Sequence, residues 1–221
     1  MRALILGVSG GIGGAVAAHL AAEGAAVTGL SRRDDGLDLT DADSVARAAR
    51  RLHDRRFDLI LNATGALVID GHQPEKTFDA VDPVAMAGQF ALNATGVALA
   101  IRHFAPLLGR EGRSVLASLS ARVGSIGDNR LGGWVGYRAA KAAQNQIIRT
   151  AAIEWRRRNK AAILIALHPG TVETALTSAY AARHKTITRD HAARSILDVI
   201  DGLTPDDSGE LLDWTGARVP W

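Results

Sequence analysis

The chain has 221 residues, of which 47% are hydrophobic and 22% are charged, and it contains no cysteine. This length fits one domain with a substantial core, and the composition is that of a globular protein. The absence of cysteine excludes disulfides and thiolate metal sites, and no other metal-ligand spacing is found, so we expect no metal. The net charge of +3 is spread over segments that also carry acids. Such segments are typical of exposed helix faces, so we expect no nucleic-acid partner.

The first residues read as a short strand that runs into glycines, and not as a signal peptide. No apolar run approaches the ~20 residues that a membrane span requires. We therefore expect a cytoplasmic protein with no membrane association.

Short apolar runs alternate with longer helical patterns along the whole chain. Strands are predicted at 2–7, 25–31, 57–65, 113–120, 161–170 and 209–214, and helices at 11–23, 41–52, 83–108, 134–157 and 189–200. This alternation predicts an α/β fold of the Rossmann type, a doubly wound parallel sheet of about seven strands with helices on both faces. In such sheets ligands bind beyond the carboxyl ends of the strands, so the residues that follow each strand are the candidates for a site.

The segment "GVSGGIGG" follows the first strand and opens the first helix. Its glycines, Gly7, Gly11 and Gly13, allow a sharp turn and let backbone N–H groups approach a pyrophosphate at the helix N-terminus. The alternative is a tight turn between a strand and a helix with no ligand. The position of the segment favours a dinucleotide site, with Ser9 and Ile12 as further contacts.

The end of the second strand is where a dinucleotide-binding protein reads the ribose. An acid at this point accepts the 2′-hydroxyl of NAD, whereas an arginine suits the 2′-phosphate of NADP. Here Ser31 is followed by Arg32 and Arg33. The pattern predicts NADP(H) in preference to NAD(H). The alternative is a pair of solvated arginines whose charge is blunted by the next two residues, Asp34 and Asp35.

The segment "DLTD" follows soon after. Asp38 and Leu39 lie where a third strand would end, so they could approach the adenine of a dinucleotide. Asp38 could equally cap the next helix.

A tyrosine and a lysine four residues apart stand out in "GYRAAKAAQNQ". On a helix Tyr137 and Lys141 share one face. A free phenol has a pKa near ~10, and a neighbouring ammonium lowers it. The pair could then serve as a general acid–base around a carbonyl or alcohol. The alternative is a lysine that extends past a half-buried tyrosine.

The glycine turn, "NATG" at 62–65 and again at 93–96, a strand end rich in serine, and Tyr-x-x-x-Lys occur in this order. In this order they resemble the short-chain dehydrogenase/reductase family, and the resemblance covers essentially the whole chain. "SIGDNRLGGWVGYRAAKAAQNQ" and "DWTGARVPW" are similar to segments of its C-factor-like and sniffer-like carbonyl reductase branch. The resemblance implies that residues 1–221 form a single NAD(P)-binding Rossmann-fold domain.

The resemblance also implies roles for individual residues. Tyr137 would protonate the substrate oxygen, Lys141 would bind the nicotinamide ribose and lower the Tyr137 pKa, and Asn93 would hold a water in a proton relay. Residues 62–65 resemble an Asn-Asn-Ala-Gly element that supports the sheet, and residues 169–174 resemble the Pro-Gly-x-Val-x-Thr segment that holds the cofactor. The implied cofactor contacts are Gly7, Ser9, Gly11, Ile12, Gly13, Ser31, Arg32, Arg33, Asp38, Leu39, Asn62, Ala63, Thr64, Gly65, Tyr137, Lys141, Pro169, Gly170, Val172 and Thr174.

The serine of the family pattern is displaced in this chain. The family places a catalytic serine second in a Ser-Ser-x-x-Gly segment, and here "SLSARVGS" puts Ser120 first and Ala121 second, counted back from Gly124. Ser125 lies beyond the glycine. Ser120 is our candidate, which requires a bulge to turn its side chain to the cofactor face. Otherwise the site has no serine.

The predicted function is an NADP-dependent oxidoreductase that interconverts a small carbonyl and an alcohol by hydride transfer. The alternative is a dinucleotide-binding regulatory or signalling protein with little turnover. The substrate lid expected after Thr174 is short and has Tyr180 as its aromatic residue, and Trp134 could line the pocket or simply pack. The apolar helices at 83–108 and 134–157 could pair in a homodimer or homotetramer.

Overall fold

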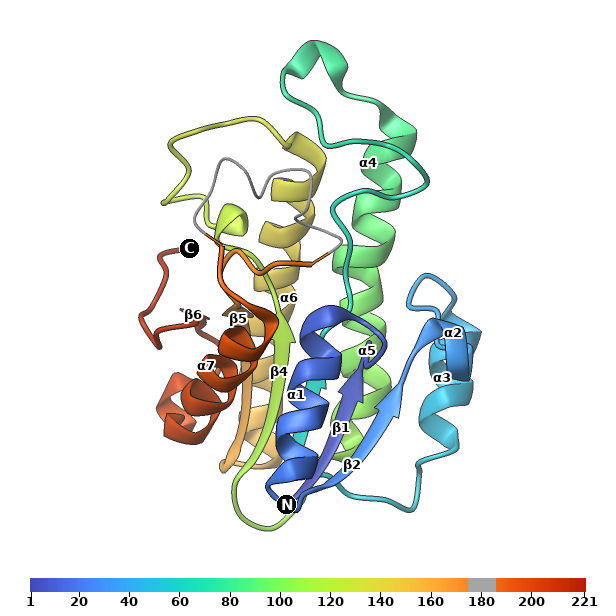
Figure 1. Ribbon diagram of the computed structural model, residues 1–221, viewed down its shortest axis with the longest axis vertical. Helices are drawn as coiled ribbons and strands as arrows, with labels where there is room; N and C mark the ends of the chain where they lie inside the picture. Colours follow the sequence, from blue (N-terminus) through green and yellow to red (C-terminus); the bar gives the residue numbers. More distant parts are fainter. Residues whose placement is uncertain (175–185) are drawn as a thin grey trace.

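One parallel sheet forms the centre of the molecule, and its strands point toward a common edge (Figure 1). The computed structural model describes residues 1–174 and 186–221. The strands are β1 (Arg2–Leu6), β2 (Ala26–Leu30), β3 (Leu59–Asn62), β4 (Ser114–Leu119), β5 (Ala162–His168) and β6 (Leu211–Asp213), in the order β2-β1-β3-β4-β5-β6. The predicted doubly wound parallel sheet is confirmed.

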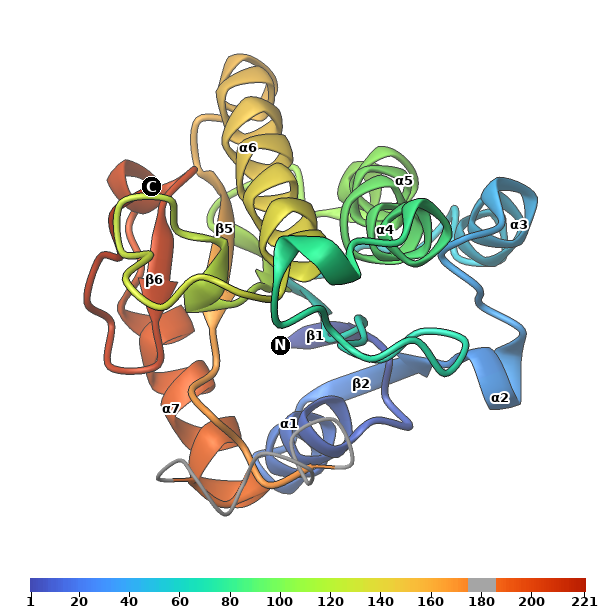
Figure 2. The same ribbon diagram turned by 90° about the horizontal axis from the view of Figure 1, so that it is seen from above.

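Helices cover both faces of this sheet (Figure 2). They are α1 (Gly11–Ala22), α2 (Arg32–Asp35), α3 (Ala42–Arg50), α4 (Pro83–Phe90), α5 (Gly96–Phe104), α6 (Val135–Arg158) and α7 (Arg189–Gly202). Helices α1 and α7 pack together on one face, and α3, α5 and α6 line the other. Successive residues of a strand face opposite sides of the sheet. Ile5 and Leu61 therefore belong to the core between the sheet and α1 and α7, whereas Leu4 and Ile60 belong to the core between the sheet and α3, α5 and α6.

The sheet has six strands in the described residues, against the prediction of about seven. No strand forms near Leu37, because the backbone N–H groups there bond to nearby residues and not to a neighbouring strand. The Leu37 N–H donates to the Ser31 carbonyl, and the Asp38 N–H donates to the Ser44 hydroxyl. This stretch only links α2 to α3.

The helix predicted at 83–108 is confirmed as one helical run over Pro83–Leu107, and its middle widens into a π turn that the sequence does not predict. Helix α4 passes into a π turn (Ala91–Thr95), then into α5 and a short 3₁₀ turn (Ala105–Leu107). The π turn holds Asn93 fully buried, with its side chain bonded to the loop after β3. Widened turns of this kind are frequent at functional sites.

The same helical run corrects the prediction that no apolar run approaches the length of a membrane span, because it is the one stretch of the described residues that is long and apolar enough by length and composition. It covers Pro83–Leu107 with a mean hydropathy of 1.5. In the structure it lies between α3 and α6 against the sheet. Core helices of globular proteins pass the same test, so the run carries no membrane assignment.

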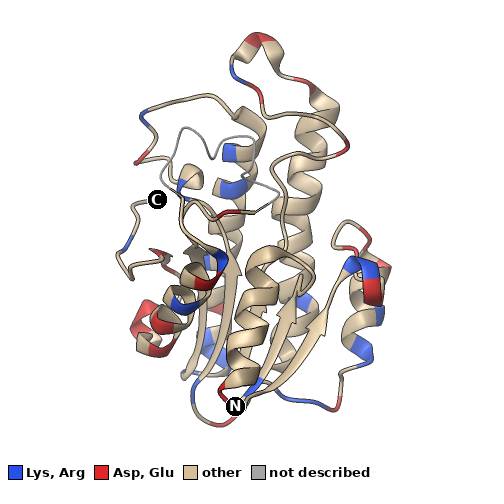
Figure 3. Cartoon of the chain, viewed as in Figure 1, with Lys and Arg blue, Asp and Glu red and all other residues tan. Residues whose placement is uncertain are grey.

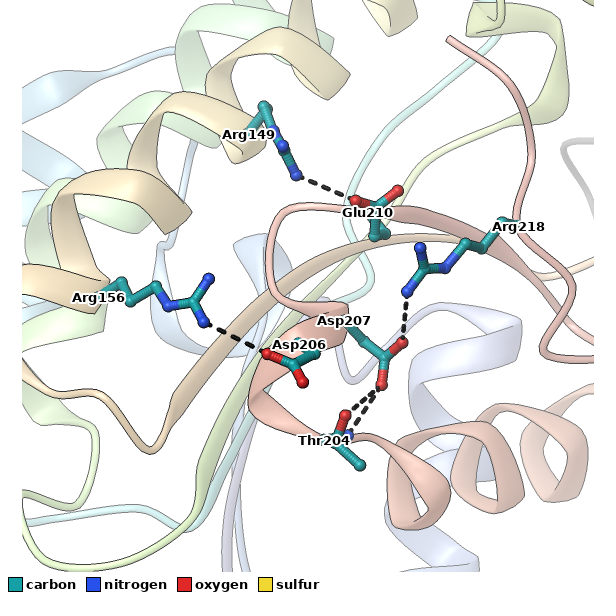
Figure 4. Close-up of polar contacts among 7 residues, drawn as sticks. All are labelled: Arg149, Arg156, Thr204, Asp206, Asp207, Glu210 and Arg218. Atoms are coloured by element: carbon teal, nitrogen blue, oxygen red, sulfur yellow. Dashed lines mark hydrogen bonds and ion pairs between the residues drawn. The ribbon is translucent and has the colours of Figure 1, made fainter.

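Ion pairs join the outer face of α6 to the C-terminal part of the chain (Figure 4). Arg149 pairs with Glu210 at 3.0 Å, and Arg156 pairs with Asp206 at 3.3 Å. Arg218 pairs with Asp207 at 3.2 Å. Basic and acidic residues are mixed on the exposed elements (Figure 3). Exposed pairs add little stability one by one, but they give the arginines of α6 local partners.

Candidate active site

The carboxyl ends of the strands bring the candidate residues to one edge of the sheet. The register aligns Leu6 of β1 with Asn62 of β3, and Asn62 with Ser118 of β4. Loops from residues 63–82 and 120–134 rise above this edge (Figure 1). Side chains far apart in sequence therefore meet where ligands bind in such sheets.

The glycine turn has the shape that a pyrophosphate needs. Gly7 has a φ of +86°, and a Cβ at Gly13 would lie 2.4 Å from the Gly7 carbonyl oxygen. Helix α1 begins after Gly10 with no side-chain cap and no acid in its first turn. Its first N–H groups are thus open to an anion, so the residues present fit the phosphates of a dinucleotide.

The two arginines that follow β2, Arg32 and Arg33, differ in their partners. Ser31 caps α2 by accepting from the Asp34 N–H, and the Arg33 Nε donates to the Asp34 carboxylate at 2.9 Å. The Arg33 guanidinium holds the pKa of the Asp34 carboxyl below its ordinary value, helped by the Ser31 hydroxyl. Arg32 is exposed and forms no hydrogen bond or ion pair within residues 1–174 and 186–221, although its charge helps to lower the pKa of the Asp38 carboxyl. Of the two arginines, Arg32 is the one available to a 2′-phosphate.

Asp38 closes a tight turn between α2 and α3. Its carboxylate accepts from the Thr40 N–H at 2.8 Å and from the Thr40 hydroxyl at 2.7 Å, and these bonds lower its pKa. Leu39 is buried against the π-turn end at Gly96. The N-cap of α3 is Asp41, so the alternative that Asp38 caps the next helix is wrong, and contact of Asp38 or Leu39 with adenine stays a prediction.

A buried polar chain links β3, β4 and α6. The Asn62 Nδ2 donates to the Ser118 hydroxyl at 3.0 Å, and the Gln144 Nε2 donates to the same hydroxyl at 3.1 Å. The Asn62 Oδ1 accepts from the Thr64 hydroxyl at 2.6 Å, which fixes the turn at residues 62–65. Asn62 therefore supports the sheet edge, as the family resemblance implies, and Ser118 lies inside this network.

The Lys141 side chain reaches the carboxyl edge of the sheet, and it is almost completely buried. Its exposed fraction is 3%, and its Nζ donates to the Gln144 Oε1 at 2.8 Å and to the Leu119 carbonyl at 3.3 Å. The Nζ also lies 5.7 Å from the centroid of the Tyr137 ring. A Cβ at Gly65 would be 3.4 Å from this Nζ and 2.9 Å from the Asn93 Oδ1. Lys141 and Asn93 thus both lie next to Gly65, and the Tyr137 ring lies next to Lys141.

Burial dominates the ionisation of this pair. It raises the pKa of the Tyr137 phenol above its ordinary value, and it lowers the pKa of the Lys141 ammonium to about 7. The prediction that Lys141 lowers the Tyr137 pKa is therefore wrong for the ligand-free protein, because both charged forms lose hydration together. Tyr137 stays protonated at neutral pH, which is the form that a proton donor needs.

Asn93 is held rigidly within the π turn. Its Nδ2 donates to the Ala66 carbonyl at 2.9 Å and to the Gln89 Oε1 at 2.8 Å, and its Oδ1 accepts from the Ala66 N–H at 3.3 Å. These contacts place Asn93 next to Gly65. Its role in holding a water stays a prediction.

The serine hydroxyls at this edge are already engaged. The Ser120 hydroxyl donates to the Asn145 Oδ1 of α6 at 2.6 Å. The Ser125 hydroxyl donates to the Pro220 carbonyl and accepts from the Asp128 N–H. Ala121, in extended backbone, occupies the position of the family serine. The recorded bonds direct Ser120 to α6 and not to the Tyr137 hydroxyl.

We therefore expect Ala121→Ser to raise turnover by offering the substrate oxygen a hydroxyl donor. Ser120→Ala should leave kcat almost unchanged and cost about 1 kcal/mol of stability, the usual value of one internal hydrogen bond. Steady-state rates and thermal unfolding of both variants test this, with Ser125→Ala as the control. A loss on the order of a hundredfold in Ser120→Ala, with normal cofactor binding, would instead assign substrate orientation to Ser120.

The segment after β5 closes the cofactor edge. Val172 bridges to Ile187, and the Arg189 Nε donates to the Glu173 carbonyl at 2.8 Å. A Cβ at Gly11 would lie 3.0 Å from this Nε and 3.0 Å from the Thr174 Cγ2, so the segment stands next to the glycine turn. The predicted lid, with Tyr180, falls in 175–185, outside the described residues.

Two functional contacts escaped the sequence patterns. Gln144 is fully buried and touches Lys141, although a glutamine in the polar run "QNQ" attracts no attention. Its spacing of three residues from Lys141 places both on one helix face and was the available signal. Glu75 bonds to the backbone at the start of α6, and no local pattern in sequence connects it to residues some 60 positions away.

Comparisons with known proteins agree with this geometry. A family model described as short chain dehydrogenase matches residues 1–185. The chain therefore belongs to the short-chain dehydrogenase/reductase family of oxidoreductases, as its motifs predicted.

Its relatives include proteins of the predicted branch. The chain is 32% identical over 206 residues to the 1-hydroxy-2-glutathionyl-2-methyl-3-butene dehydrogenase of Rhodococcus sp. (strain AD45), covering 92% of this chain and 84% of that protein. It is 35% identical over 141 residues to the C-signal of Myxococcus xanthus, covering 64% and 81%. The structure of the carbonyl reductase Sniffer of D. melanogaster has a TM-score of 0.80 at 17% identity and covers 100% of this chain and 99% of that one. The similarity to C-signal supports the predicted C-factor-like branch, and the likeness to Sniffer confirms the fold.

Proposed function

We propose that this oxidoreductase reduces a small carbonyl compound with NADPH, or oxidises the corresponding alcohol with NADP. The observation that carries the proposal is the buried Tyr137–Lys141 pair, whose lysine lies with Asn93 next to Gly65 at the carboxyl edge of the sheet. The glycine turn lies at the same edge and fits a dinucleotide phosphate.

When bound, the nicotinamide supplies or accepts the hydride. The residues of the chain transfer the proton and orient the substrate and the cofactor. The protonated phenol of Tyr137 donates to the substrate oxygen as negative charge develops there. The Lys141 ammonium holds ribose hydroxyls and, when charged, favours the phenolate that remains. The raised pKa of Tyr137 keeps the phenol protonated at neutral pH, which is the form that donates in carbonyl reduction.

The direct experiment follows NADPH absorbance over a panel of aldehydes, ketones and diketones. The panel includes, in the reverse direction, an alcohol that bears a glutathione thioether, because the Rhodococcus relative is named for one. Turnover that depends on Tyr137 supports the enzyme. The similarity to C-signal and the presence of Ala121 favour a second candidate, a regulatory dinucleotide-binding protein. Tight NADPH binding with no turnover on any substrate would select that candidate.

The cofactor preference gives a separate prediction. Arg32→Ala should weaken NADPH binding by about tenfold or more and leave NADH binding unchanged, since a charge-assisted bond to phosphate is lost. Arg33→Ala should have a smaller effect, because Arg33 is paired with Asp34. Arg189→Gln is the matched comparison: it lies by Gly11, so it should weaken both cofactors equally. Fluorescence titration measures the NADPH and NADH dissociation constants of the wild type and of each variant.

Equal dissociation constants for NADPH and NADH in the wild type would contradict the NADP preference. An unchanged NADPH affinity in the Arg32→Ala variant would contradict the assignment of the contact.

We also propose a cytoplasmic homodimer or homotetramer built from one domain over residues 1–221, which light scattering and limited proteolysis test.

A further inference from the structure

The helix that carries Tyr137 begins without a cap of its own. Its N-cap residue, Trp134, has a φ of +52° and a ψ of 44°, makes no side-chain cap bond, and is followed by no acid in the first turn. A left-handed backbone is uncommon for a bulky residue and persists where its surroundings impose it. The first N–H groups of a helix also need acceptors from elsewhere.

Glu75 supplies these acceptors from the loop between β3 and α4. Its Oε2 accepts from the Gly136 N–H at 3.2 Å, and its backbone carbonyl accepts from the Trp134 N–H at 2.5 Å. The Glu75 side chain is only 7% exposed. A carboxylate is favoured at a helix N-terminus because it compensates the positive end of the helix dipole. Glu75 thus accepts hydrogen bonds from two backbone N–H groups at the start of α6, those of Trp134 and Gly136.

This clamp lies directly beside the proton donor. Gly136 immediately precedes Tyr137, and a Cβ at Gly136 would be 2.9 Å from the Glu75 Oε1, so the carboxylate rests on the helix backbone. The Trp134 ring meets the Tyr137 ring edge to face, with centroids 6.2 Å apart and planes at 70°. Any shift of the first turn would therefore move the phenol.

We infer that Glu75 is a positioning residue for Tyr137, which fixes the first turn of α6 so that the phenol faces the substrate oxygen. The inference rests on the proposed function of Tyr137. Glu75 acts through the backbone of α6, so it should affect the chemical step and not cofactor binding. Misplacement of a reacting group by about 1 Å can cost on the order of a hundredfold in rate.

The test compares Glu75→Ala with Glu75→Gln, whose amide oxygen can still accept from the Gly136 N–H. Glu75→Ala should lower kcat by about tenfold or more and leave the NADPH dissociation constant within about threefold, while Glu75→Gln restores most of kcat. Hydrogen exchange of a peptide covering residues 132–141 should be faster in the alanine variant and near wild type in the glutamine variant. Asp79→Ala is the control, because Asp79 is an exposed carboxylate on the same loop.

A wild-type kcat and exchange rate in Glu75→Ala would overturn the inference, and so would an equal loss of kcat in Glu75→Gln. If Glu75→Ala does not fold, Glu75→Asp takes its place. Its carboxylate is one methylene short, so we expect a lowered kcat, and an unchanged kcat with unchanged exchange would count against the clamp. If the wild type has no turnover at all, the proposed function fails, whereas the exchange measurement still decides whether Glu75 holds the first turn of α6.

Discussion

Replacement of Tyr137 by phenylalanine should lower kcat by about a thousandfold or more and leave the NADPH dissociation constant within about twofold. The ring remains, so its burial and its edge-to-face contact with Trp134 are kept. Only the hydroxyl is lost, and with it the donor that protonates the substrate oxygen. Stopped-flow or steady-state NADPH oxidation measures the rate, and fluorescence titration measures binding.

Thermal unfolding provides the control for this variant. Burial raises the pKa of the Tyr137 phenol, so a neutral phenol and a phenyl ring are equivalent in charge near pH 7, and the unfolding temperature should change little. A Tyr137→Phe protein that retains most of its turnover would remove the general acid from the mechanism. A variant that has lost NADPH binding would show that the hydroxyl serves the cofactor instead.

Much of the fold could be predicted from local patterns. Continuous apolar runs predicted the strands because both faces of a parallel sheet are buried, as the core residues of β1 and β3 illustrate. The glycine turn was recognisable because a close approach such as that of Gly13 to the Gly7 carbonyl excludes a side chain. Tyr137 and Lys141 were predictable as a pair because helical geometry alone places them on one face.

Other features of the site depend on contacts that no local pattern encodes. Arg32 and Arg33 are equivalent in sequence, and the pairing of Arg33 with Asp34 separates them. The direction of the Ser120 hydroxyl depends on Asn145, a residue of the following helix. The π turn at Asn93 leaves the apolar pattern of a single helix unchanged. The polar contacts of Glu75 and Gln144 arise from packing between distant segments.

The sign of the Tyr137 pKa shift has the same origin. In isolation a nearby ammonium lowers the pKa of a phenol. Burial removes water from both groups at once, and this cost raises the pKa of Tyr137 and lowers that of Lys141. Two residues four apart in sequence cannot reveal how much water surrounds them.

Lys141→Met should weaken NADPH binding and lower kcat/KM by about a hundredfold or more, because it removes both the ribose contact and the charge beside the phenol. Methionine fills similar space without a charge, so the buried position should tolerate it. Lys160→Met is the matched control, since Lys160 is exposed and follows the far end of α6. The control should match the wild type in binding, rate and unfolding temperature.

The lowered pKa of Lys141 also predicts two opposite pH dependences. The folded value is about 7 against an ordinary 10.5, so the free protein loses this proton as the pH rises through 7. If the ammonium form binds the ribose, NADPH affinity should fall by up to about tenfold per pH unit above pH 7. Over the same range the unfolded chain holds more protons than the ligand-free fold. The free energy of unfolding should therefore rise with pH, and this contribution is lost as the pH falls toward 7.

Titrations between about pH 7.5 and 9.5 separate this effect from the cofactor's 2′-phosphate, which titrates near ~6. Arg32 and Arg33 keep their charge throughout, and Tyr137 stays protonated because its pKa is raised. Lys141→Met should therefore flatten both the affinity and the stability profiles, whereas Lys160→Met should leave both slopes in place. Equal slopes in the wild type and Lys141→Met would mean that Lys141 does not bind the cofactor as a cation. A slope that appears in stability alone would confine Lys141 to a structural role and leave the ribose hydroxyls to other donors at the edge of the sheet.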